Sequence, residues 1–184
     1  MGESVAGAVD LNRDGRPDFL AGAPDINRPA EPGRIRTFLS TSPVGSRLVT
    51  FGSPCTGSSG RRPSIRATGR AALGASFEVR LSGALPSSSA FLLLGFSNSN
   101  ANGLPLPFDL GLIGAPGCTQ YVSLDIGIAY ATDATGRARA PLPVPSDPAL
   151  AGNSIYLQWI DLDLFANALR LTTSGGLEAR IGEL

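Results

Sequence analysis

Histidine and lysine are both absent from the 184-residue sequence, and all fifteen basic residues are arginine. Histidine is the usual general acid or base near neutral pH, and lysine supplies Schiff-base amines and binds phosphate. The sequence also lacks a Gly-x-Ser-x-Gly nucleophile motif, a phosphate-binding loop and a cofactor fingerprint. These absences exclude much of hydrolase and transferase chemistry, and we expect a protein that is not an enzyme.

Net charge and long apolar runs are lacking as well. The fifteen arginines balance fifteen acidic residues, so we expect no binding to nucleic acid or to an anionic membrane. Residues 91–94 are apolar, but a membrane span needs about 20 such residues, and we expect no membrane insertion. Glu3 and Asp10 stand where a secretory leader is basic and then apolar. If the protein is secreted, we therefore expect this chain to be a fragment, a mature form or one with a misassigned start.

Glycine and proline are abundant, with 23 and 15 residues, well above the roughly 12% of average usage. Residues that break helices at this frequency disfavour long helices. Apolar residues nonetheless make up 42% of the sequence, too many for a disordered chain. The composition therefore predicts an all-β fold with many turns.

Alternating side chains indicate individual strands. Phe77, Val79 and Leu81 alternate with charged residues, which predicts a strand with those three side chains turned inward. Residues 91–96 are apolar throughout, as in a central strand. Further strands are expected at 119–124, 136–142, 155–162, 169–173 and 177–181, and a short helical turn at 145–152. The pattern predicts an antiparallel β-sandwich, either immunoglobulin-like or jelly-roll-like.

An acidic loop at residues 10–18 places oxygen-bearing side chains at alternate positions. Calcium takes six to eight oxygen ligands, and a glycine allows the tight bend of such a loop. The carboxylates would repel one another in an empty site, so we expect Ca2+ to order the loop. The alternative is an ordinary solvated turn. The expected ligands are the side chains of Asp10, Asn12, Asp14 and Asp18 and the backbone carbonyl of Arg16.

The segments around this loop resemble one FG-GAP repeat, the calcium-binding blade unit of integrin-type β-propellers. The resemblance rests on residues 2–7, the acidic loop, residues 22–24 and the strand that follows Gly33. Met1 replaces the usual Phe, and Arg16-Pro17 replaces the usual Gly-Tyr. The resemblance implies a partial calcium-binding blade at residues 1–40. Because propeller blades bury one another's faces, a solitary blade must dock on the rest of the chain, pair between chains, or have lost its upstream blades.

The rest of the chain follows a Ser/Thr/Pro/Gly-rich segment, and we expect a linker at 41–50 and the sandwich at 51–184. The sandwich segment resembles a carboxy-terminal β-sandwich module that recurs after repeat regions in large secreted bacterial proteins. That resemblance informs architecture and location, not activity. It rests on Gly74 and on residues 91–97, 104–107, 114–118, 147–152 and 156–159.

Cys55 and Cys118 are the two cysteines of the sequence. A disulfide between them would close a loop of about 60 residues and stabilise the fold by roughly 4 kcal/mol in the chain-entropy model. The alternative is a pair of unconnected buried thiols. A disulfide would indicate an oxidising compartment. Together with the family resemblance, it predicts an extracellular or cell-surface protein.

Aromatic side chains offer a second kind of candidate site. Tyr156 and Trp159, with Tyr121 and Tyr130, could form a platform that stacks against sugar rings. The alternative, which we favour, is that a lone Trp in an alternating strand belongs to the core.

Asp161 and Asp163 share one face of an expected strand and could suggest the paired carboxylates of a glycoside hydrolase. Two residues that are neighbours on one strand do not define opposed positions across a sugar. We therefore expect these two side chains to lie at a solvated strand end.

Taken together, these features predict a non-catalytic extracellular module with a calcium-stabilised blade. Its expected role is structural, adhesive or in assembly, by self-association through exposed β edges or with neighbouring domains of a larger secreted protein. The alternative is a carbohydrate-binding module that binds a glycan.

Overall fold

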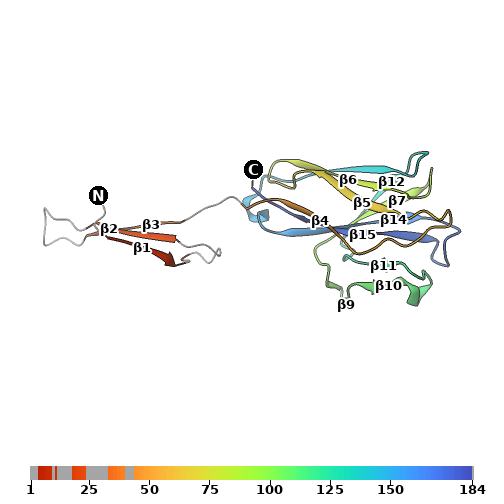
Figure 1. Cartoon of the computed structure of the whole chain (residues 1–184), viewed down its shortest axis with the longest axis horizontal. Helices are drawn as coiled ribbons and strands as arrows, with labels where there is room; N and C mark the ends of the chain where they lie inside the picture. Colours follow the sequence, from red (N-terminus) through yellow and green to blue (C-terminus); the bar gives the residue numbers. More distant parts are fainter. Residues whose placement is uncertain (1–3, 10, 12–17, 24–32, 40–43, 184) are drawn as a thin grey trace. The chain divides into compact units, whose positions relative to one another are not determined.

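The chain divides into two compact units, Met1–Ser42 and Pro43–Leu184, which Figure 1 colours from red to orange and from orange to blue. The computed structural model describes residues 4–9, 11, 18–23, 33–39 and 44–183. Regular structure in these residues consists of β-strands and two short 3-10 helices. The predicted all-β fold is confirmed. Among the described residues, no helix has the length and apolar character needed to cross a membrane.

The first unit holds a three-stranded antiparallel sheet in the order β1-β2-β3. Its strands are β1 (Ser4–Val9), β2 (Asp18–Ala23) and β3 (Arg34–Phe38). Phe19 on β2 lies directly opposite Phe38 on β3. The Phe19 ring also lies over Gly7, 3.3 Å from where a Cβ would stand. Glycine on β1 therefore lets an aromatic ring cover that strand.

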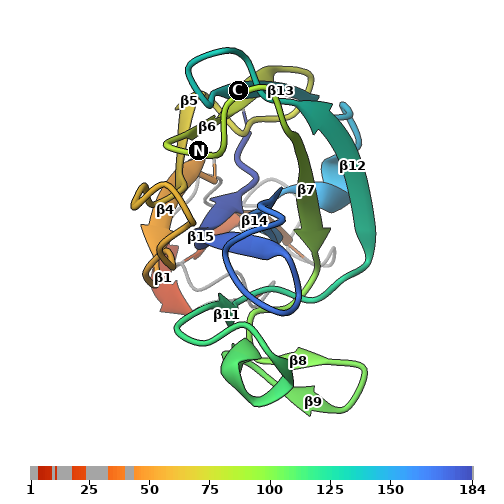
Figure 2. The same cartoon turned by 90° about the vertical axis from the view of Figure 1, so that its right-hand side faces the viewer.

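The second unit is a sandwich of two antiparallel sheets. One sheet has the order β12-β7-β14-β15-β4 and the other β13-β6-β5. Figure 2 shows β5, β6 and β13 gathered on one side of the five-stranded sheet. The larger sheet contains β12 (Ile126–Ala131), β7 (Ser89–Gly95), β14 (Ser154–Leu162), β15 (Leu171–Arg180) and β4 (Arg47–Phe51). The smaller contains β13 (Ala138–Pro143), β6 (Ser76–Ser82) and β5 (Ser64–Gly69).

The core lies between the two sheets. Phe77, Val79 and Leu81 on β6 are all buried, as their alternation predicted. They belong to one cluster with Leu92 of β7 and Trp159 of β14. The β7 strand pairs with β12 on one side and β14 on the other, so its prediction as a central apolar strand is confirmed. Local alternation thus orients the strands that build the core.

Short elements decorate the sandwich. A 3-10 helix, η2 (Pro148–Leu150), begins at Asp147, whose side chain accepts a hydrogen bond from Ala149 N. The predicted short helical turn is therefore confirmed. The remaining elements are η1 (Leu110–Ile113), β8 (Asn100–Ala101), β9 (Leu104–Pro105), β10 (Phe108–Asp109) and β11 (Thr119–Gln120). The last of these covers only the start of the strand expected at 119–124.

Strand β4 changes the expected domain boundary. It runs from Arg47 to Phe51 and pairs with β15, so residues 47–50 belong to the sandwich rather than to a linker. The physical reason is that one edge of β15 would have unpaired backbone N–H and C=O groups without β4. The backbone of β4 forms hydrogen bonds with those groups. The residues that precede β4 are rich in serine and proline, and for that reason we did not predict this strand from the sequence.

Two expected strands are one continuous strand in the structure. We expected 169–173 and 177–181 to be separated by Gly175 and Gly176, but β15 runs through both glycines. Phe51 of β4 lies opposite Gly176 of β15. The Phe51 ring occupies the space that a Cβ on Gly176 would need. An aromatic ring over a strand glycine compensates for the missing side chain.

Besides β4, the sandwich strands β5 and β12 were not predicted. Both lie at sheet edges. Each carries glycine or small residues, namely Gly69 in β5 and Gly127 in β12. Because glycine and small residues are uncommon in strands, the sequence of β5 and β12 does not show the alternation that predicts a strand.

Candidate functional site

Asp18 is the one predicted calcium ligand that the structure describes. It begins β2 and its side chain is 1% exposed. Its Oδ2 accepts a 2.8 Å hydrogen bond from the backbone N–H of Leu11, which draws the two ends of the acidic loop together. The other predicted ligands, Asp10, Asn12, Asp14 and Arg16, lie outside the described residues.

The chemistry of the acidic loop fits a calcium ion. A buried carboxylate is stable only when it is hydrogen-bonded, paired or bound to a metal, and Asp18 is such a group. Carboxylate, amide and backbone carbonyl oxygens are the ligands that calcium prefers. A bound ion would cross-link the loop and neutralise its carboxylates. Within the described residues, no group of three or more His, Cys, Asp or Glu side chains is arranged to hold a metal.

Cys55 and Cys118 form a disulfide with a Cα–Cα distance of 4.7 Å across 63 positions of sequence, as predicted. Both cysteines are buried in a small cluster with Leu110 and Ala115. The bridge joins the segment after β4 to the segment before β11. It therefore fastens the smaller β10–β11 region to the edge of the sandwich.

Tyr156 and Trp159 do not form a shared aromatic surface. Trp159 is fully buried, and its ring makes an edge-to-face contact with Tyr130 at 5.4 Å between centroids. Tyr156 instead contacts Phe51 at 6.4 Å. Side chains three positions apart on a strand point to opposite faces, which separates the two rings. The favoured interpretation, in which Trp159 belongs to the core, is therefore confirmed, and Tyr156 and Trp159 do not form a sugar platform.

Asp161 and Asp163 are each 1% exposed, which corrects the expected solvated strand end. Asp161 Oδ2 accepts a 2.8 Å hydrogen bond from Leu85 N. Asp163 accepts hydrogen bonds from Ser58 N at 2.7 Å and from Ser58 Oγ at 2.6 Å. Each carboxylate therefore anchors a distant loop. Sequence analysis missed this role because Ser58 and Leu85 lie far away along the chain.

The Asp161 carboxylate is only partly satisfied. Its Oδ1 is buried without a hydrogen-bond partner. Burial is the main cause that raises the pKa of Asp161 to about 6, and the charge of Asp163 adds to the rise. The hydrogen bonds from Leu85 and Thr172 lower the pKa in part. The folded protein therefore keeps Asp161 protonated up to a higher pH than an ordinary aspartate, with the protonated form in excess below about pH 6.

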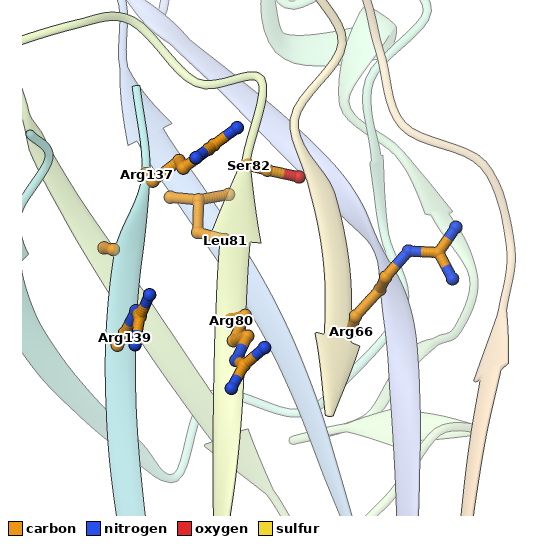
Figure 3. Close-up of a pocket in the computed structure, with 7 residues that line it drawn as sticks. Arg66, Arg80, Leu81, Ser82, Arg137 and Arg139 are labelled. Carbon is orange, nitrogen blue, oxygen red and sulfur yellow. The ribbon is translucent and has the colours of Figure 1, made fainter. Parts of the chain in front are cut away.

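Arginine side chains gather on the outer face of the smaller sheet of the sandwich, β13-β6-β5. Arg66 on β5 and Arg139 on β13 each lie directly opposite Arg80 on the central strand β6. Arg137 lies beside them, and all four are exposed. We call these four residues the arginine face. Figure 3 shows the four side chains beside one another on this sheet. They line an open hollow of about 250 Å³.

The electrostatics of the arginine face are unfavourable for folding. Like charges directly opposite across strands destabilise a sheet, by roughly 0.2–1 kcal/mol per pair, the size of other cross-strand effects. Glu78 offsets part of this repulsion through an ion pair with Arg80 Nε. Figure 3 shows the guanidinium group of Arg66 directed away from that of Arg80. The alternation of residues along β6 predicted that Arg80 is exposed. The alignment of Arg66 and Arg139 with Arg80 depends on the register between strands.

Comparison with known proteins bears on the first unit. Residues 1–35 match the family model described as FG-GAP repeat. No curated protein and no solved structure matches the chain. The C-terminal β-rich region has no family assignment, and its expected likeness to a secreted bacterial module stays a prediction. Residues 1–35 are therefore one FG-GAP repeat, a repeat that is typical of extracellular calcium-binding propeller proteins.

Proposed function

We propose that the protein is a non-catalytic extracellular assembly module whose FG-GAP blade is stabilised by calcium and pairs with the blade of a second copy. The observation that carries this proposal is the exposed apolar surface of the blade. Val5 is 71% exposed and Ile35 is 76% exposed, and Phe19 and Phe38 are about half exposed. An apolar surface of this kind on a small sheet favours association.

The apolar side chains lie on both faces of the blade. Phe19 and Phe38 are cross-strand partners and share one face. Ile35 lies three positions from Phe38 on β3 and therefore belongs to the other face. Propeller blades bury both faces against neighbouring blades. A second copy of the same blade offers a surface with matching chemistry.

Two further observations support an extracellular location and a calcium role. The disulfide between Cys55 and Cys118 is of the kind that persists in oxidising compartments. FG-GAP repeats commonly bind calcium, and the buried Asp18 carboxylate stands at the base of the acidic loop. Calcium would order the loop and thereby hold β1 and β2 in register.

A structural role also agrees with the buried carboxylates. Asp161 and Asp163 bind loop backbone rather than facing a cleft. The sequence contains no histidine that could serve as a general base. These observations favour an assembly role over catalysis.

Sedimentation of the full chain with calcium or with chelator tests this proposal. We expect concentration-dependent association that is strongest with calcium. The variant Ile35→Ser/Phe38→Ser should be monomeric. A matched control is Leu112→Ser/Phe165→Ser, which replaces two side chains of the second unit that are 76% and 85% exposed. A monomeric wild-type protein, or equal loss of association in both variants, would refute assembly through the blade.

A further inference from the structure

We propose that the arginine face of the sandwich binds a linear anionic polysaccharide, one that carries sulfate or carboxylate groups. The choice of a polysaccharide rests on the extracellular location in the proposed function. The binding surface itself lies in the second unit and uses none of the blade residues. It is also distinct from the aromatic platform that the sequence suggested.

The arginine face places positive charges side by side on the sheet. Arg66, Arg80 and Arg139 occupy three successive strands in direct register. Within the described part of the chain, Glu78 is the one carboxylate paired with this row, through Arg80. The guanidinium groups of Arg66 and Arg139 form no ion pair with any described residue. A chain with no net charge thus concentrates unneutralised positive charge on one sheet face.

The spacing of Arg66, Arg80 and Arg139 suits a polymer with repeated anionic groups. Neighbouring strands lie about 4.8 Å apart, so three arginines cover about 10 Å across the sheet. The planar guanidinium group forms paired hydrogen bonds with carboxylate, sulfate and phosphate oxygens. Arg137, which directly precedes β13, adds a fourth positive charge beside the open hollow. A polymer with repeated anionic groups can therefore contact several arginines at once.

The surface around the arginines is polar and lacks aromatic side chains at its outward positions. The outward positions of β5, β6 and β13 are arginine, serine, threonine, proline and one glutamate. Single-stranded nucleic acid is usually bound by aromatic rings that stack on its bases, and these strands offer no such ring at those positions. Ser64 and Ser82, whose hydroxyl oxygens lie 2.8 Å apart, border the row and offer hydrogen bonds to sugar hydroxyls.

The repulsion between the arginines costs folding free energy. A row of like charges opposes folding, and among the described residues the ion pair of Arg80 with Glu78 is the one ion pair that the row forms. Real proteins tend to break rules of local consistency at functional sites. An anionic ligand would relieve the repulsion between Arg66, Arg80 and Arg139 when it binds.

The test compares two double variants of the full chain by calorimetric titration. Arg66→Gln/Arg139→Gln removes two charges from the arginine face. Arg47→Gln/Arg180→Gln is the matched control, because it removes the same number of charges from two exposed arginines that are cross-strand partners on the five-stranded sheet. The probes are heparin and polygalacturonate, with dextran as a neutral polymer and a single-stranded DNA oligonucleotide as a different polyanion.

We expect heparin or polygalacturonate to bind the wild-type protein, and binding to weaken at least tenfold in Arg66→Gln/Arg139→Gln. The control variant should stay within twofold of wild type, and added salt should weaken binding. Melting of the Arg66→Gln/Arg139→Gln variant at or above the wild-type temperature would confirm that its loss of binding is not unfolding.

Several outcomes would overturn the inference: no binding of either acidic polysaccharide, equal losses in the two double variants, or tighter binding of DNA than of the acidic polysaccharides. The titrations are repeated with chelator, where binding should persist. Failure of the calcium and sedimentation experiments would refute the assembly proposal alone. Failure of the titrations with an intact calcium response would refute only the polysaccharide site.

Discussion

The backbone N–H of Leu11 donates a 2.8 Å hydrogen bond to Oδ2 of Asp18. This bond joins the start of the acidic loop to the first residue of β2. It fixes one carboxylate of the loop at a buried position. Any ion held by the loop would therefore be coupled to the position at which β2 begins.

Replacing Asp18 tests that coupling. Asp18→Asn keeps an oxygen that can accept the Leu11 hydrogen bond but removes the charge that attracts calcium. We expect the calcium-induced rise in the melting temperature of the blade to fall by more than half, as measured by calorimetry with calcium and with chelator. Asp147→Asn, at the start of η2 in the second unit, should leave the calcium response unchanged. An undiminished response in Asp18→Asn would contradict a ligand role for Asp18.

Replacing Trp159 tests its assignment to the core. Trp159→Ala should lower the free energy of unfolding by about 3–5 kcal/mol, because it opens a cavity between the sheets. Phe165→Ala is the control, since Phe165 is 85% exposed, and it should change stability by less than about 0.5 kcal/mol. Urea denaturation followed by circular dichroism measures both. Similar small effects in the two variants would argue against the buried position of Trp159.

Removing the disulfide tests its contribution to stability. The variant Cys55→Ser/Cys118→Ser should lose about 4 kcal/mol of unfolding free energy, because the unfolded chain regains the entropy of a loop of 63 positions. Denaturant unfolding of the variant and of the oxidised wild type supplies the comparison. Wild type unfolded under reducing conditions should match the variant. A loss below about 1 kcal/mol would contradict the chain-entropy account.

Asp161 should make stability depend on pH. Burial raises its pKa from an ordinary 3.8 to about 6, so the folded protein holds a proton that the unfolded chain has already released. The stabilisation from this proton is complete below pH 3.8 and is lost as the pH rises to about 6, by about 3 kcal/mol in total. Asp161→Asn should remove this decline, as denaturation at a series of pH values would reveal. An unchanged decline in the variant would assign it to other groups.

Much of the architecture could be predicted from local pattern. Phe77, Val79 and Leu81 are buried as their alternation indicated, because the period of a strand is a property of the strand itself. The loop ending at Asp18 and the flanking strands sufficed to identify the FG-GAP repeat. The prediction was wrong where a side chain from another segment fills the space beside a glycine. At Gly176, the ring of Phe51 fills this space and the strand continues.

The sequence by itself determined the all-β class, the FG-GAP repeat and the fact that Cys55 has Cys118 as its one possible disulfide partner within the chain, since these depend on composition, short motifs and the number of cysteines. Only the tertiary structure decided the burial of Asp161 and the alignment of Arg66 and Arg139 with Arg80. The physical reason is that alternation within a strand is local, whereas register between strands and the partners of a buried carboxylate depend on segments far apart in the chain.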